Sequence, residues 1–294
     1  MSKKIKQHKK LNIKHLHPMD SFGIVSGITK EIRVTRLEKR LNPLVAFPHK
    51  HNFYHLVIIL SGSGWHEIDF KRYKVQKGAI FFMGPAQVHS WQMSTDTTGI
   101  VIEFVNQSLQ SIDEQGIVST ALSSKLDSQI LSGTSREDVF SLAKELLVEY
   151  EKLEDQFELV MRFKLSILIL ILKRVQNKGL VAPTRSSKFK EEFLFLLEKN
   201  YKKEHSPDFY SKKLNLTTKS LTEKVKRHFG KNLRGIIQER CLLEAKRLLA
   251  YSDLSVSDIA HEIGFLDPNY FTRFFKLKTL QNPGNFRNSV RKIC

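Results

Sequence analysis

The feature that most constrains this chain of 294 residues is an internal repeat near its C-terminal end. Residues 209–226 are matched by residues 259–276, and the second halves of the two copies lie 50 residues apart. Each copy reads as a short helix, a turn of three or four residues and a second helix, which is the helix-turn-helix arrangement. The sequence therefore predicts an all-α region that contains two units of the same kind.

Local signals indicate where these helices begin. Thr218 and Asp267 are suitable N-cap residues, and Pro268 follows at a first helical position, where its missing N–H costs nothing. Between the two units, residues 233–251 have the apolar spacing of one long helix, which spans about 27 Å at 1.5 Å per residue. This long helix would hold the second helices of the two units about 27 Å apart. That separation matches successive major-groove segments of B-DNA, which repeat every ~34 Å.

Positive charge is concentrated at the two ends of the chain. The whole chain has 48 Lys and Arg against 30 Asp and Glu, which gives a net charge of +18. Residues 1–40 carry +8, residues 41–183 carry −1 and residues 184–294 carry +11. This asymmetry favours a neutral module joined to a region that binds an anionic partner such as nucleic acid. The alternative is that the basic residues only form a solvated face.

Residues 190–290 resemble the DNA-binding domain of AraC/XylS-type bacterial transcription regulators. The resemblance rests on many ordered motifs: Arg240 with 245–249, then 254–260, 263–265, 269–276, Phe229 with Gly230, and 283–287. It implies that two helix-turn-helix units in one chain bind duplex DNA. Two departures concern local geometry: Leu233 replaces a common Pro, and the segment 278–281 lacks the usual Gly.

The resemblance also implies which side chains face the bases. They are Lys219, Thr222 and Glu223 in the first unit and Asn269, Thr272 and Arg273 in the second. Arg273 suits a bidentate contact to guanine and Asn269 suits adenine, whereas a Glu at position 223 accepts from cytosine N4 but repels phosphate. Lys226 and Lys276 lie one turn further along and suit phosphate contacts. The alternative is that all these residues are solvated.

The N-terminal half has a different pattern. From about residue 33 to residue 104, short apolar runs alternate with Gly, Pro and Asn or Asp, which predicts a β-barrel or sandwich. Residues 135–177 change to a helical period, with a break expected within 150–156. The second of these helices is apolar nearly all round, so it is expected in the core or between subunits. Leu168 is our candidate for a residue at a dimer interface, unless it belongs to the core.

Part of this region resembles the two short motifs of the cupin barrel. The matching residues are His49, His51, His55, Gly62, Gly78, Pro85 and His89, with His55 in the place where a metal-binding cupin has Glu. Three readings stay open: lining of an effector pocket, structural hydrogen bonding, or a metal site of the imidazole type that suits Zn, Fe or Ni. We expect an effector pocket with neither metal nor cofactor, lined by His49, His51, Phe53, Trp65, His66, His89 and Trp91.

The predicted fold is therefore multi-domain. We expect an all-β, cupin-like barrel with trailing helices, followed by an all-α domain of two helix-turn-helix units joined by a long helix. The predicted boundaries are 1–134 for the sensor domain with its basic arm, 135–178 for a helical dimerisation segment, 179–188 for a linker and 189–294 for the DNA-binding domain.

The cellular location is predicted from the small number of Cys residues and the lack of long apolar runs. Two Cys are too few for a disulfide framework, and the basic N-terminus is not followed by an apolar core. The strongest apolar run, 165–172, is far shorter than the roughly 20 residues that span a membrane. We expect a cytoplasmic, nucleoid-associated protein without a membrane partner. The basic residues between Lys3 and Lys14 are read either as a solvated tail or as a contact to effector, linker or DNA.

Three functions remain at this stage. The first, which we favour, is a DNA-binding transcription regulator controlled by a small-molecule effector in the barrel. It would form a homodimer through residues 137–177, and RNA polymerase is a further candidate partner. The second is a ligand-independent regulator whose barrel only dimerises. The third, a cupin metalloenzyme, leaves the helix-turn-helix region unexplained, so we expect no enzyme activity and assign no catalytic residue.

Overall fold

The computed structural model describes residues 32–40, 48–105, 107–114, 117–123, 126, 128–176 and 185–293. The basic arm, most of the predicted linker and Cys294 lie outside these residues. None of the helices in the described ranges is both long and apolar enough to cross a membrane.

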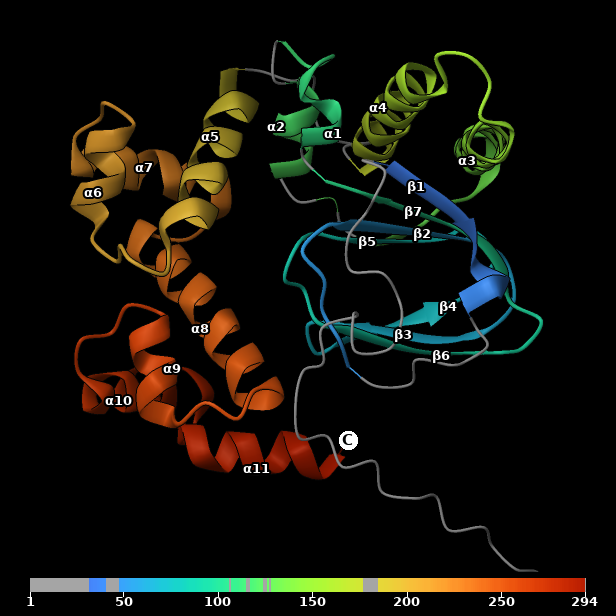
Figure 1. Ribbon diagram of the computed structural model, residues 1–294. Coiled ribbons are helices and arrows are strands. Elements are labelled where there is room, and N and C mark those ends of the chain that lie inside the picture. The colour runs from blue at the N-terminus through green and yellow to red at the C-terminus, as the bar shows by residue number, and fades with distance from the viewer. Residues whose placement is uncertain are drawn as a thin grey trace, which may run out of the picture.

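The N-terminal half is built on two antiparallel sheets, which lie one above the other in Figure 1. The larger sheet has the strand order β1-β7-β2-β5-β8 and the smaller one has the order β4-β3-β6. The strands are β1 (Ile32–Arg36), β2 (Tyr54–Ser61), β3 (Gly64–Ile68), β4 (Lys71–Val75), β5 (Ala79–Met83), β6 (His89–Met93), β7 (Thr98–Phe104) and β8 (Gln129–Ile130). A 3-10 turn, Leu37–Arg40, follows β1.

The larger sheet is buried on both faces, which explains why its strands read as nearly continuous apolar runs. Leu56 and Ile58 belong to the core beneath the covering helices, whereas Val57 and Ile59 belong to the core between the sheets. Because successive side chains of a strand point to opposite faces, His55 and Glu103 share the inward face with Val57 and Val101. The barrel interior therefore holds polar groups at one end and apolar groups at the other.

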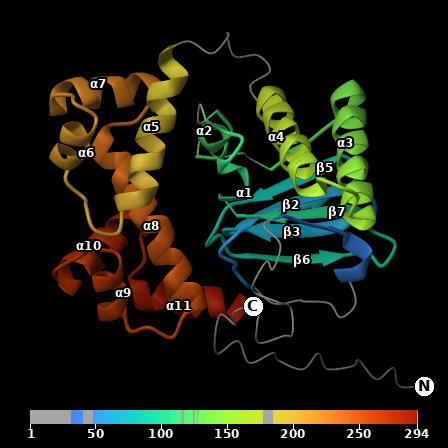
Figure 2. The same cartoon turned by 45° about the horizontal axis from the view of Figure 1, so that its top comes forward.

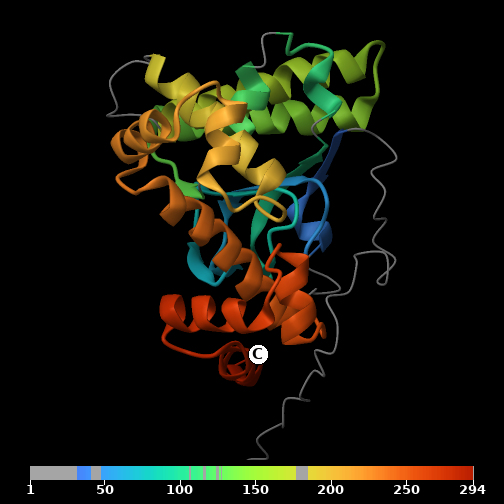
Figure 3. The same cartoon turned by 90° about the vertical axis from the view of Figure 1, so that its left-hand side faces the viewer.

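Helices cover the outer face of this sheet. They are α1 (Gln107–Gln110), α2 (Ile117–Ser123), α3 (Gly133–Lys152) and α4 (Phe157–Gln176). Helices α3 and α4 lie side by side over the sheet (Figures 1 and 3). The expected break between them falls at residues 153–156, where Leu153 ends α3 in the left-handed conformation.

The C-terminal half is entirely helical among its described residues. It comprises α5 (Arg185–Asn200), α6 (Pro207–Lys213), α7 (Thr218–Phe229), α8 (Leu233–Tyr251), α9 (Val256–Glu262), α10 (Pro268–Thr279) and α11 (Pro283–Ile293). Helices α6 and α7 form one helix-turn-helix unit and α9 and α10 form the other, at opposite ends of α8 (Figures 1 and 2). A single apolar core, from Phe193 to Phe275, joins both units to α8.

Three details differ from the sequence prediction. The N-cap of α7 is Thr217 instead of Thr218, since the Thr217 hydroxyl accepts a hydrogen bond from the backbone N–H of Ser220 at 3.1 Å. Two adjacent Thr residues offer the same cap chemistry, so the sequence alone does not separate them. Helix α5 begins at Arg185, within the stretch predicted as a linker, and α3 begins two residues before the predicted boundary at 135.

Candidate DNA-binding surface and barrel site

Each second helix of the repeat presents the same pattern of exposed side chains. In α7, Lys219, Glu223 and Lys226 are exposed and Thr222 is half-buried. In α10, the residues 50 positions later, Asn269, Arg273, Lys276 and Thr272, have the same exposure in the same order. The side chains on the opposite faces are buried. They are Leu221 and Val225 in α7 and Phe271, Phe274 and Phe275 in α10.

The two helices are also fixed by equivalent backbone contacts. Asp267 caps α10 by accepting from the N–H of Asn269 at 2.8 Å, as Thr217 caps α7. The hydroxyl of Thr222 donates to the carbonyl of Thr218, and the hydroxyl of Thr272 donates to that of Pro268. Both Thr protons are thus engaged, which leaves the hydroxyl oxygen as an acceptor and the methyl group for an apolar contact with a base.

The basic side chains on this surface are available to an anion. No ion pair with another described residue engages Lys219, Lys226, Arg273 or Lys276. All four of these cationic residues are exposed. Long cationic side chains that are already solvated can contact phosphate without first breaking a buried pair.

A cluster of histidines fills the polar end of the barrel interior. His49, His51, His55, His66 and His89 are all buried. The Nε2 atoms of His51 and His89 lie 3.0 Å apart, and the Nε2 of His66 lies 3.0 Å from the Nδ1 of His89. The rings of Phe53 and Trp91, which are also buried, pack within this cluster.

Burial keeps several of these rings neutral. Burial, and then the charges of His55 and His49, hold the pKa of His51 well below its ordinary value, although Glu103 opposes the shift. Burial followed by neighbouring histidines does the same to the pKa values of His66 and His89. Neutral imidazoles have a lone pair on one nitrogen, so the cluster can accept protons in hydrogen bonds or bind a cation.

The barrel contacts the helical domain through a strained turn. Asp69 and Phe70 join β3 to β4 with φ angles of 48° and 67°, a conformation that favours Gly, Asn or Asp, so Phe70 is the strained residue. The Asp69 carboxylate accepts from Nε and Nη2 of Arg247 on α8, at 2.7 and 2.6 Å. The Phe70 ring stacks on Tyr251 with the ring centroids 5.5 Å apart. Both residues of the turn thus contact α8.

Family models match two parts of the chain. Residues 31–163 match the AraC-like ligand binding domain and residues 210–289 match a helix-turn-helix domain. The chain belongs to the AraC/XylS family. It is a DNA-binding transcription regulator with a ligand-binding N-terminal domain, as the resemblance in its sequence implies. The match covers both halves that the fold separates.

The chain is also similar to individual curated proteins and solved structures. The HTH-type transcriptional activator RhaS of Escherichia coli O139:H28 is 25% identical over 276 residues, which cover 92% of this chain and 96% of RhaS. Among solved structures, ToxT of Vibrio cholerae O395 is 12% identical, covers 89% of this chain and 99% of its own, and has a TM-score of 0.42. The yesN C-terminal domain of Fusobacterium nucleatum is 29% identical over 34% of this chain and 98% of its own, with a TM-score of 0.34.

One residue of the expected effector pocket of this AraC-family protein lies elsewhere. Trp65 is on the outer face of β3, where its indole N–H donates to Gln92 and the Arg72 guanidinium lies over its ring. Neighbouring residues of a strand face opposite sides, so Trp65 and His66 cannot both line the barrel interior. The other six residues of the set lie together inside the barrel.

Sequence reasoning missed a carboxylate in this cluster. Glu103 is fully buried on β7, its Oε1 lies 3.3 Å from Nδ1 of His55, and Arg33 on β1 pairs with its Oε2. The available signal was a single charged residue at an inward position of an otherwise apolar strand. A buried carboxylate of this kind is retained only with partners, which Arg33 and His55 supply.

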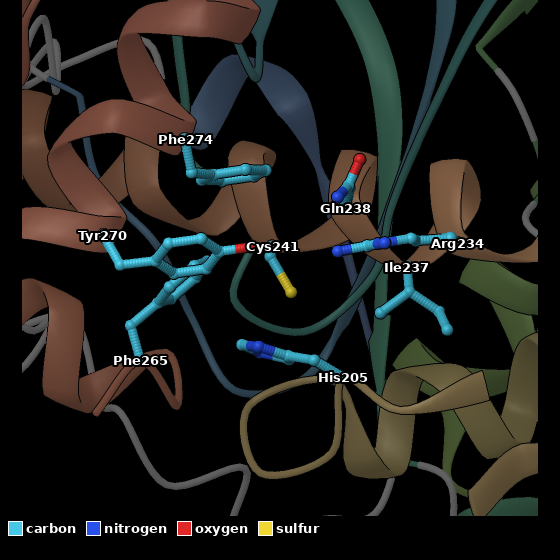
Figure 4. Close-up of a pocket in the computed structure, with 8 residues that line it drawn as sticks. All are labelled: His205, Arg234, Ile237, Gln238, Cys241, Phe265, Tyr270 and Phe274. Carbon is cyan, nitrogen blue, oxygen red and sulfur yellow. The ribbon is translucent and has the colours of Figure 1, made fainter. Parts of the chain in front are cut away.

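A small cavity lies between α8, the loop residue His205 and the second helix-turn-helix unit. Its volume is about 90 Å³, and Figure 4 shows the side chains around it: His205, Arg234, Ile237, Gln238, Cys241, Phe265, Tyr270 and Phe274. Burial raises the pKa of the Cys241 thiol to about 12. The thiol therefore stays protonated at neutral pH and is unsuited to act as a nucleophile.

The covering helix α4 has an exposed apolar stripe. Leu168 is completely buried in the core against the sheet, so the core alternative for this residue is the correct one. Phe163 and Ile167 are 51% and 50% exposed, and Leu159 lies one turn before them. Positions 159, 163 and 167 are four residues apart and share one helix face.

Proposed function

We propose that this chain regulates transcription by placing α7 and α10 in successive major-groove segments, with its DNA affinity set by a ligand in the barrel. The observation that carries the proposal is that positions 219, 222, 223 and 226 of α7 have the same exposure as the positions 50 residues later in α10. A structural repeat without function would need only its buried face to be repeated. Here the exposed positions repeat as well, and Thr222 and Lys226 recur as Thr272 and Lys276.

Within this proposal, each exposed residue has a stated role. Arg273 binds guanine with both arms of its guanidinium group and Asn269 binds adenine, while Lys226 and Lys276 contact phosphates. Lys219, Thr222 and Glu223 read bases in the first unit, with Glu223 accepting from cytosine N4. Thr272 contributes its methyl group and hydroxyl oxygen.

Contacts between the barrel and α8 connect the histidine cluster to the DNA-binding helices. Arg247 lies on α8, which carries both units, and the Asp69 carboxylate that holds it also accepts from Nε2 of Gln87 and from the N–H of Val88. Val88 precedes His89 of the buried cluster. A ligand that repositions His89 would therefore act on the contact with α8, provided that it binds the two positions with different affinities.

Selection of bound DNA fragments by the purified chain, with and without a metabolite extract, tests the regulatory proposal. We expect a recurring site whose affinity falls steeply with salt and changes with the extract. An affinity with no salt dependence contradicts the DNA-binding role. A specific site that never responds to small molecules favours the ligand-independent regulator, in which the barrel only dimerises.

We further propose a homodimer through the stripe on α4. Ile167→Asp should shift the chain toward monomer in sedimentation, because it places a charge in an apolar interface, whereas Lys144→Asp on the exposed side of α3 should not. Retained thermal unfolding would show that the variant is folded. An unchanged association state of folded Ile167→Asp would exclude this face as the interface.

The remaining assignments follow from the same role. Contact with RNA polymerase and association with the nucleoid belong to a regulator bound at promoters, and co-purification with and without nuclease treatment tests both. We assign no enzyme activity, because the relatives are transcription regulators.

A further inference from the structure

The histidine cluster brings three ring nitrogens together from two parts of the chain, residues 51–55 and residue 89. One nitrogen from each of His51, His55 and His89 lies within 4.8 Å of the other two. His55 is on β2 of the larger sheet and His89 is on β6 of the smaller sheet, while His51 precedes β2. The cluster therefore bridges the two sheets at the polar end of the barrel.

Each of the three rings is oriented through its Nδ1 atom. Nδ1 of His51 donates to the carbonyl of Phe53 at 3.1 Å. Nδ1 of His55 faces the buried Glu103, which Arg33 holds in turn. Nδ1 of His89 lies 3.0 Å from Nε2 of His66. Metal-binding histidines are typically fixed in this way, with the second nitrogen on a carbonyl, a carboxylate or another partner.

The donor set fits a particular class of ion. Three buried imidazoles without a carboxylate among the ligands suit divalent zinc, nickel or iron better than magnesium or calcium, which prefer oxygen. Since Nδ1 of His51 is the proton donor to a carbonyl, its Nε2 has the lone pair that a metal needs. The 3.0 Å between Nε2 of His51 and Nε2 of His89 is close to the spacing of two nitrogens on one ion, each about 2.0–2.1 Å from it.

We propose that His51, His55 and His89 bind one divalent transition-metal ion through their Nε2 atoms, with Glu103 as the positioning residue for His55. This replaces the expectation of a barrel without metal. It names a ligand for the site of the proposed function, and it rests on that function only for the effect on DNA binding.

Ligation keeps the protons in balance. Without an ion, Nε2 of His89 donates to Nε2 of His51, and His66 donates to Nδ1 of His89. With the ion, His89 carries its proton on Nδ1 and His66 becomes the acceptor, so its own proton moves to Nδ1. Every ring stays neutral and no proton is lost.

The test uses the full chain, freed of any affinity tag and stripped with a chelator. Titration with Zn²⁺ should show one ion per chain and a rise in the unfolding temperature. Co²⁺ in place of Zn²⁺ should give the visible absorption of a nitrogen-bound ion. His89→Gln and His51→Gln should weaken binding more than the 10–100-fold expected of Glu103→Gln. His261→Gln, an exposed histidine on α9, is the matched control.

The outcomes separate this inference from the proposed function. No stoichiometric ion, or equal binding by the wild type and folded His89→Gln, overturns the metal site. Should the variants not fold, the Co²⁺ spectrum of the wild type decides, and oxygen-only ligation overturns it. One ion per chain with unchanged DNA affinity supports the metal site and counts against effector control by this ion. If no ion binds but another ligand changes the DNA affinity, the metal site is overturned and effector control of DNA binding is supported.

Discussion

The two helix-turn-helix units share a backbone plan but differ in charge and in strain. Where the first has Glu223, the second has Arg273, at equivalent exposed positions. Where α7 ends on Gly230 with a φ of 68°, α10 ends on Leu280 with a φ of 62°, and both residues donate to the carbonyl four positions earlier. The repeat therefore preserves geometry, while chemistry is free to diverge.

The units also meet the barrel differently. The second unit adjoins the end of α8 and α11, where Tyr251 and the partly buried Val290 pack with Phe70 and Val88 of the barrel. The first unit approaches through α5, whose Glu198 helps to raise the pKa of Tyr54 on β2, after burial. A change in the barrel should therefore reach the second unit more directly.

The largest expected effect concerns this asymmetric docking. Asp69→Ala should destabilise the chain by about 2–5 kcal/mol, since it truncates one partner of a buried, hydrogen-bonded charge pair. Glu67→Ala removes an exposed pair with Arg72 on the same hairpin and should cost no more than about 1 kcal/mol. Chemical denaturation measures both. Equal losses would mean that the contact with α8 contributes little.

The next effect concerns the charge difference between the units. Arg273→Ala should cost about 1–3 kcal/mol of binding and relax specificity at one base position. Glu223→Ala should cause a smaller loss, or a gain on sequences without cytosine at its position, because it removes a repulsion from phosphate. Binding to a panel of single-base operator variants distinguishes them. A uniform loss for Arg273→Ala would assign it to phosphate.

The strain difference predicts a smaller change in stability. Leu280→Gly should stabilise the helical domain by about 1 kcal/mol, because a left-handed conformation is costly for residues with a Cβ. Leu280 is exposed, so the substitution removes little packing. Gly230→Leu should destabilise by a similar amount, and nothing within 4 Å would obstruct its Cβ. In thermal unfolding, the unfolding temperature should rise for Leu280→Gly and fall for Gly230→Leu. A shift in the same direction for both variants would reject this explanation.

The smallest effect concerns the shared phosphate contacts. Lys226→Ala and Lys276→Ala should each weaken binding by the same factor across sequences and reduce the slope of log K against log salt by about 1. Anisotropy titrations at several salt concentrations give the slope. A loss of base preference in either variant would move that lysine into the base-reading set.

Much of the helical domain could be predicted because its signals are local. Helix α8 spans the predicted residues 233–251, and Pro268 stands at the first position of α10. The missing Gly near residue 280 does not disturb the last turn, since Leu280 adopts the left-handed conformation. Whether the exposed residues bind DNA as assigned stays a prediction.

The contacts that were missed join distant parts of the chain. Asp69 and Arg247 are 178 residues apart, and no local pattern pairs them. Glu103 faces His55 only because β2 and β7 pair in a particular register. Leu168 differs from the exposed Ile167 by one step around α4, a distinction that depends on how the helix is rotated on the sheet. Trp65 is the exception, since strand alternation could have excluded it.

The most direct test is hydroxyl-radical footprinting of the purified chain on a selected DNA fragment. We predict two protected segments on one face of the duplex, about one helical turn apart, with Arg273→Ala weakening only the segment bound by the second unit. A single protected segment, or equal weakening of both, would contradict the claim that α7 and α10 read DNA as two separate units.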